Sequence, residues 1–226
     1  MFTAFLIAAA MTPDVLPRYP GPVLSGRASE RYEICIELIN EDLEIGRIAA
    51  EQWAAEGGGA AAGHCRAVGD LKSGKPKTAA IRLLDVAERN DAGDALTRAK
   101  ILEQAALAWL AAEDAKQAGD AIAAAQALAP NSGELSLTAG VVHAANEKWS
   151  AAIKSITAAE EAGFQSADGF VARASGQMAL LKHDLAAEDV VAALKIDPFN
   201  LDALVLRGQL HTLGVEIEAN YQRRTK

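Results

Sequence analysis

The sequence predicts an all-α protein, an α-solenoid of about five antiparallel helix pairs followed by a C-terminal helix. The main observation is that small side chains recur at a 34-residue step. The positions that keep this step are Ala118, Ala152 and Ala186; Ala125, Ala159 and Ala193; and Ala106, Gly140 and Ala174. Small residues at this period are typical of helix pairs that bury their apolar faces only against neighbouring pairs.

The composition supports the same fold class. Half of the residues are apolar but only 5% are aromatic, and alanine makes up much of the apolar content. Alanine is the best helix former, and its small side chain lets helices approach closely. No segment shows the sustained alternation of apolar and polar residues that is typical of a half-buried strand.

Two helix pairs are expected before the regular repeats. The first pair covers residues 30–39 and 43–56, and three consecutive glycines at 57–59 end its second helix. The second pair covers residues 60–71 and 76–89, with Pro76 at a position where the first turn of a helix tolerates proline. The loop that follows ends at Asp94, which suits the N-cap of the next helix.

Three repeat units then run in phase, over residues 99–132, 133–166 and 167–200. In the first unit, the second helix is expected over 115–128, before Pro130. In the second unit, Asn131 and Glu134 have the spacing of a capping box. In the third unit, the polar run 182–184 predicts a turn two residues late and a second helix shortened by about two residues. A last helix is expected over 201–211.

These residues resemble the tetratricopeptide repeat (TPR) family over roughly residues 29–211. The positions that carry the resemblance are Ala106, Trp109, Ala118, Ala125 and Pro130; Gly140, Ala152, Ile156 and Ala159; and Phe170, Ala174, Ala186, Val190, Ala193 and Pro198. Phe164 replaces the expected proline in the second unit. The whole chain also resembles small exported repeat proteins of Gram-negative bacteria. The resemblance implies a protein-interaction scaffold that binds a peptide or helix of a partner.

A rotation that accumulates from pair to pair predicts a right-handed superhelix whose concave face is lined by the first helix of each pair. The resemblance implies that these residues face that groove: Lys100, Glu103, Leu107, Leu110, Glu134, Leu137, Val141, Val171, Ser175 and Met178. This lining is mostly apolar with an acidic rim, so it favours an apolar helix or hydrophobic peptide over a peptide carboxylate. The alternative is that the same residues pack against an adjacent helix or the N-terminal arm.

The N-terminal residues differ from the repeats. Residues 1–11 are apolar with an A-x-A spacing at Ala8 and Ala10, which favours a signal peptide, although no basic residue precedes them. A short apolar helix and a misassigned start codon are the alternatives. Residues 12–28 contain four of the seven prolines and predict an extended linker. The repeat domain is then expected over residues 29–226.

The two cysteines, Cys35 and Cys65, lie 30 residues apart, close to one repeat. First helices of neighbouring pairs lie side by side in a solenoid, so equivalent positions can approach disulfide distance, although axes about 8–10 Å apart leave little tolerance. Two buried thiols are the alternative. The apolar N-terminal segment favours export, so we expect a periplasmic or exported protein, with a cytoplasmic one as the alternative, and an oxidising compartment would in turn favour the disulfide.

Charge and motifs narrow the function further. The net charge of −8 and the lack of a basic patch argue against nucleic acid as a partner. No catalytic motif, metal-ligand spacing or cofactor motif is present, and residues 1–11 are too short to span a bilayer. We therefore expect a non-enzymatic scaffold with a protein or peptide partner in the cell envelope. The alternative is a non-catalytic accessory subunit of a cytoplasmic enzyme complex, and the oligomeric state stays open.

Overall fold

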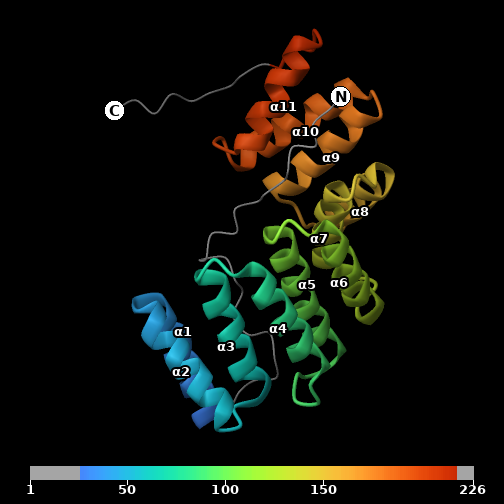
Figure 1. Cartoon of the computed structure of the whole chain (residues 1–226). Helices are drawn as coiled ribbons and strands as arrows, with labels where there is room; N and C mark the ends of the chain where they lie inside the picture. Colours follow the sequence, from blue (N-terminus) through green and yellow to red (C-terminus); the bar gives the residue numbers. More distant parts are fainter. Residues whose placement is uncertain (1–25, 218–226) are drawn as a thin grey trace. The chain divides into compact units, whose positions relative to one another are not determined.

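The computed structural model describes residues 26–217, which form α-helices and turns without any strand (Figure 1). The helices are α1 (Arg27–Glu41), α2 (Leu43–Ala55), α3 (Gly59–Lys72), α4 (Pro76–Glu88), α5 (Ala95–Ala111), α6 (Ala115–Leu128), α7 (Gly133–Ala145), α8 (Trp149–Glu161), α9 (Ala167–Ala179), α10 (His183–Ile196) and α11 (Leu201–Thr212). Five helix pairs and a last single helix match the fold class predicted from the sequence. The expected signal peptide and most of the proline-rich linker lie outside the described residues, and α1 begins at Arg27, inside the last part of that linker.

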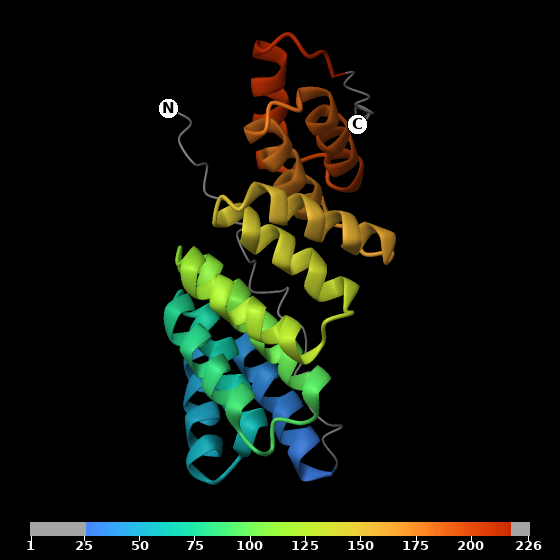
Figure 2. The ribbon, with the colours of Figure 1, turned by 90° about the vertical axis from the view of Figure 1, so that its right-hand side faces the viewer.

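The described chain forms two compact units, residues 26–135 and residues 136–217, so the boundary falls within α7. In each unit, helices that follow one another in the chain pack side by side (Figure 2). First helices of successive pairs also touch: α1 contacts α3, and α9 contacts α11. This arrangement is that of an α-solenoid, in which each pair buries its apolar face against its neighbours. Between residues 26 and 217, no helix combines the length and the apolar character that crossing a bilayer requires.

The turns inside three helix pairs share one backbone conformation. Glu113, Glu147 and Leu181, which lie one repeat apart from one another, have φ angles of 59°, 55° and 58°. In each turn, the N–H of the following residue returns to a carbonyl five residues back, as Asp114 does to Trp109 at 2.9 Å. This pattern is the Schellman motif, which ends a helix through backbone hydrogen bonds rather than through a particular side chain.

The predicted slip in the third unit is wrong. Helix α10 begins at His183, one full repeat after the start of α8 at Trp149, and it is as long as α6. The turn closes at Leu181 through its backbone, and His183 and Asp184 already belong to the first helical turn. Polar residues are common in that first turn because its N–H groups have no intrahelical partner, which is why the run resembled a loop.

Side-chain caps fix the starts of several helices. Asp94 accepts a hydrogen bond from the N–H of Thr97 at 2.8 Å, as the sequence predicted. The capping box expected at Asn131 is not formed, because Ser132, one residue later, accepts from the N–H of Leu135 at 3.3 Å. The hydroxyl of Ser132 is close enough to the first turn, whereas Asn131 lies in the preceding turn and is exposed.

The phased small residues lie in the core, as expected. All six alanines of the rows that start at Ala118 and Ala125 have 0% exposure. A side chain added at Gly140 would collide with Ile156 of α8, so this position needs the close approach that glycine allows. The 34-residue step therefore reports helix contact distances.

A buried ion pair links the helices of residues 136–217. Arg173 of α9 donates two hydrogen bonds to Asp189 of α10, at 2.8 and 2.7 Å, and a third to Glu160 of α8 at 2.6 Å. These carboxylates, Asp189 first, raise the pKa of the guanidinium. Because Arg173 and Asp189 are both largely shielded from water, each needs the other for its charge to be compensated.

Candidate functional site

The residues predicted to line the groove fall into two sets, one in each compact unit. Residues 26–135 contain Lys100, Glu103, Leu107, Leu110 and Glu134. Residues 136–217 contain Leu137, Val141, Val171, Ser175 and Met178.

In the first set, four residues are partly exposed. Lys100 forms an ion pair with Glu134 at 3.1 Å, and both side chains keep over a third of their surface exposed. Leu107 and Leu110 of α5 are half-buried. Glu103 is only 8% exposed, so its side chain is buried rather than open to solvent.

The second set lies largely in packing positions. Val171 is 2% exposed and belongs to a core cluster with Phe170 and Ala203, so its assignment to the groove is wrong. Val141, at 8% exposure, is also buried. Both side chains are apolar, and their burial removes apolar surface from water, which favours the folded state.

The remaining three residues of this set are half-buried. The hydroxyl of Ser175 donates to the carbonyl of Val171 in its own helix at 2.8 Å, and Met178 packs against the cluster that contains Leu210. Leu137 lies against Gly169 and lines a shallow depression with Phe164. This unit therefore presents fewer free groove residues than the sequence predicted.

A buried chain of three polar side chains joins the first helices of residues 26–135. Tyr32 of α1 and His64 of α3 are 3.0 Å apart between the hydroxyl and Nδ1. His64 Nε2 lies 2.7 Å from Oε1 of Gln104 on α5. The three side chains are 4%, 0% and 2% exposed.

The chemistry of these partners sets the direction of both hydrogen bonds. The amide oxygen of Gln104 can only accept, so Nε2 of His64 carries the proton and donates it. Nδ1 of His64 then accepts from the hydroxyl of Tyr32. The amide nitrogen of Gln104 is left as a buried donor without a hydrogen-bond partner among the described residues.

His64 is neutral at physiological pH. Burial lowers the pKa of its imidazole to about 4, and the hydrogen bond with Gln104 opposes this shift only in part. A neutral imidazole donates at one nitrogen and accepts at the other, as this chain of hydrogen bonds requires.

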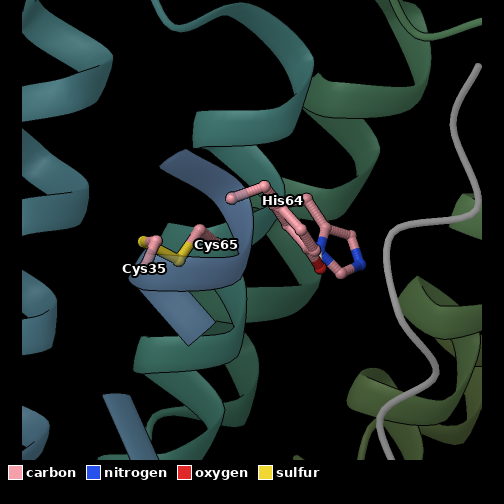
Figure 3. Close-up of a disulfide and its surroundings, with 4 residues drawn as sticks. Cys35, His64 and Cys65 are labelled. Atoms are coloured by element: carbon pink, nitrogen blue, oxygen red, sulfur yellow. Dashed lines mark hydrogen bonds between the residues drawn. A yellow bond between two sulfur atoms is a disulfide. The ribbon is translucent and has the colours of Figure 1, made fainter. Parts of the chain in front are cut away.

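A disulfide between Cys35 and Cys65 holds the same helices together. It joins α1 to α3 with a Cα–Cα distance of 6.5 Å, and both cysteines are buried. Figure 3 shows that Cys65 and its neighbour His64 extend from α3 on different sides, the cysteine toward Cys35. The disulfide therefore restrains the two helices that position Tyr32 and His64.

Gln104 shares a helix face with two predicted groove residues. Lys100 lies four residues before it and Leu107 three residues after it on α5, and residues at these spacings are neighbours on a helix surface. The sequence patterns did not identify Tyr32, His64 or Gln104 as site residues. The available signal was a lone amide in an alanine-rich helix, since the equivalent positions of the next three repeats hold Thr138, Ala172 and Leu206.

The three side chains form a hydrogen-bonded chain inside the core of this unit. Residues 26–217 hold no cluster of three His, Cys, Asp or Glu side chains that could bind a metal ion. Both ring nitrogens of His64 are engaged in hydrogen bonds within the core, so neither is open to a substrate. Within this chain of three side chains, the amide nitrogen of Gln104 is the donor without a hydrogen-bond partner among the described residues.

Solved structures with the same fold support the repeat assignment. YrrB, described as a TPR protein with an unusual peptide-binding site, has a TM-score of 0.60 and 17% identity, covering 80% of this chain and 92% of its own. TTC0263, a TPR protein of Thermus thermophilus, has a TM-score of 0.55 and 18% identity, covering 82% of this chain and 99% of its own. No protein-family model and no curated protein sequence matches the chain. The helix pairs, their 34-residue step and these two likenesses together show that the chain has the tetratricopeptide repeat fold.

Proposed function

We propose that this protein is an interaction scaffold that binds an extended peptide segment of a partner protein across α1, α3 and α5. The observation that carries this proposal is the amide nitrogen of Gln104, which is buried and has no hydrogen-bond partner in the described part of the chain. A buried donor without a partner costs about 1–3 kcal/mol. A ligand that supplies an acceptor at this point recovers that cost on binding.

The residues around Gln104 favour a peptide as the ligand. Every peptide unit carries a carbonyl acceptor, so an extended segment brings acceptors at regular intervals to a neutral donor. Leu107 provides apolar surface on the same helix face, and the ion pair of Lys100 with Glu134 lies at its edge. Grooves that recognise peptides combine main-chain hydrogen bonds with apolar contacts in this way. YrrB, which shares the fold, is itself described by a peptide-binding site.

A random peptide library displayed on phage tests the proposal, because it samples many sequences and requires no identified partner. The full chain is immobilised, and the affinities of selected peptides are measured by calorimetry for the native chain and for Gln104→Leu. The loss of one hydrogen bond to a buried group predicts a dissociation constant raised about 10- to 100-fold.

Gln126→Leu on α6 is the matched control, because it removes the same amide from a half-buried position on a second helix. It should leave the affinity unchanged. Selection of no peptide at all, or equal affinities for the native chain and Gln104→Leu, would contradict the proposed site.

We further propose that the scaffold works in the cell envelope after export. The buried disulfide between Cys35 and Cys65 supports this location, because disulfides persist in oxidising compartments and are rare in the cytosol. Mass spectrometry of the protein from its native cells would report the mature N-terminus and the state of both thiols. An intact Met1 together with free Cys35 and Cys65 would contradict export.

A further inference from the structure

Helix α11 presents an open face that the equivalent helix of the preceding pair buries. Positions one repeat apart correspond between α9 and α11. In α9, Ala167, Phe170 and Ala174 are 8%, 6% and 0% exposed, because they face α10 and α11. Their counterparts on α11 are Leu201, which is 72% exposed, Leu204, which is half-buried, and Gly208, which is exposed.

The surroundings of Gly208 show that no second helix of the described chain packs against this face. At Gly140, two repeats earlier, an added side chain would collide with Ile156 of the second helix α8. At Gly208 an added Cβ meets no atom within 4 Å. The small residue that allows a second helix to approach closely is therefore present on α11 without an opposing helix among the described residues.

The described chain after α11 does not cover this face. Helix α11 ends with the positive φ of Gly214, and the N–H of Val215 returns to the carbonyl of Leu210 at 3.0 Å. Val215 and Ile217 then pack against the cluster of Ala174, Ala186, Val190 and Leu210. That cluster lies on the opposite side of α11 from Leu201 and Gly208, since Leu210 and Ala203 form the buried stripe of the helix.

We infer that the face of Leu201, Leu204 and Gly208 pairs with the same face of a second copy of this chain. Leu204 and Gly208 are four residues apart, so a large side chain and a position without a side chain lie next to each other on one stripe of the helix. An antiparallel pairing about a twofold axis between them places Leu204 of each copy over Gly208 of the other. Such self-complementarity is what an isologous interface requires, and twofold dimers are the commonest oligomers.

The charges carried by α11 itself do not oppose this pairing. The chain as a whole carries a net charge of −8, which opposes association between copies. Helix α11 contains one acid, Asp202, and one base, Arg207, whose charges cancel. Neither charge lies on the stripe of Leu201, Leu204 and Gly208, because their spacing places them on its flanks. Pairing through this face therefore brings no like charges together.

Sedimentation velocity of the full chain over roughly 1 µM to 1 mM, the range of weak to moderate dissociation constants, tests this pairing. The native chain should shift with concentration from one copy of 23.6 kDa to a species of two. Gly208→Glu places a charge in the seam and should raise the dissociation constant of the dimer at least about tenfold. Because glutamate forms helices better than glycine and meets open space here, the monomer should unfold at the same or a higher temperature.

Gln209→Glu is the matched control, since it adds the same charge to the adjacent residue, off the stripe. It should leave the dimer intact. A native chain that stays monomeric over the whole range would overturn the inference, as would equal dimerisation of native chain and Gly208→Glu. Species larger than two copies would overturn the twofold pairing, because an isologous contact closes after one partner.

Discussion

The hydroxyl of Tyr32 donates a hydrogen bond to Nδ1 of His64 at 3.0 Å and so joins two helices that lie in different repeats. Both side chains are buried, and the hydrogen bond continues through His64 to Gln104 of a third repeat. Because burial lowers the pKa of His64, the stability of the folded chain depends on the protonation of this imidazole.

Stability should fall between pH 6.5 and pH 4 because of His64. The pKa of His64 is about 4 in the folded chain, below the 6.5 of an ordinary histidine. Between these two pH values, the unfolded chain therefore binds a proton that the folded chain does not bind. Neutral His64 contributes about 3 kcal/mol to the free energy of unfolding. This contribution is complete above pH 6.5 and is lost as the pH falls from 6.5 to 4. Urea denaturation from pH 7 to pH 4 measures it. In His64→Gln this part of the pH dependence should disappear, and parallel curves for both proteins would contradict the assignment.

The disulfide should contribute strongly to the stability of residues 26–135. Closing a loop between Cys35 and Cys65, 30 residues apart, corresponds to about 3–4 kcal/mol in the chain-entropy description. The double variant Cys35→Ala/Cys65→Ala should unfold at correspondingly lower urea concentration. A reductant should lower the midpoint of the native chain but leave that of the double variant unchanged. A native chain whose urea midpoint does not change with reductant would show that the disulfide adds little to the stability.

Leu181→Gly should stabilise the protein by up to about 1 kcal/mol. Leu181 has a φ of 58°, a conformation that costs a residue with a Cβ roughly 1–2 kcal/mol and glycine very little. Its side chain is 76% exposed, so little burial is lost with it. Thermal denaturation measures the change. Leu185→Gly, at an exposed position inside α10, is the control and should destabilise by about 1 kcal/mol. Equal losses in both variants would contradict the role of the turn.

Arg173→Met should destabilise residues 136–217 by about 3–5 kcal/mol, because it leaves the buried carboxylate of Asp189 without its partner. The double variant Arg173→Met/Asp189→Leu should recover most of that loss, since both charges are then replaced by apolar groups. A double-mutant cycle by urea denaturation gives the coupling between the two residues. Additive losses would mean that the pair is not coupled in the folded chain.

Leu107→Lys should prevent capture of the library-selected peptides while the chain keeps its helicity and melting temperature. Leu107 is half-buried beside Gln104, so a lysine there can reach solvent but places a charge against an apolar ligand. Leu137→Lys is the comparison. Because Leu137 packs against Gly169, a charge at Leu137 should lower the melting temperature, unlike the charge at Leu107. Unchanged peptide capture by Leu107→Lys would remove this residue from the site.

Local sequence patterns predicted most of the fold correctly. The predicted helix 115–128 matches α6, and the N-cap at Asp94 forms as expected, because both depend on residues close in sequence. The slip expected near His183 was wrong because a turn closed by the backbone leaves no side-chain signature. Among the predicted groove residues, Lys100 and Leu107 lie on a partly exposed face, whereas Val171 belongs to the core.

The 34-residue step of small side chains was enough to predict a stack of helix pairs, because it records contact distances that repeat along the chain. The spacing of Cys35 and Cys65 likewise predicted that they lie on equivalent helices of neighbouring pairs. The meeting of Tyr32, His64 and Gln104 became visible only in the folded chain, as did the open face of α11, which lacks an opposing helix in the described part of the chain. Burial and hydrogen bonding between residues more than thirty positions apart depend on how helices rotate against one another, which no local spacing specifies.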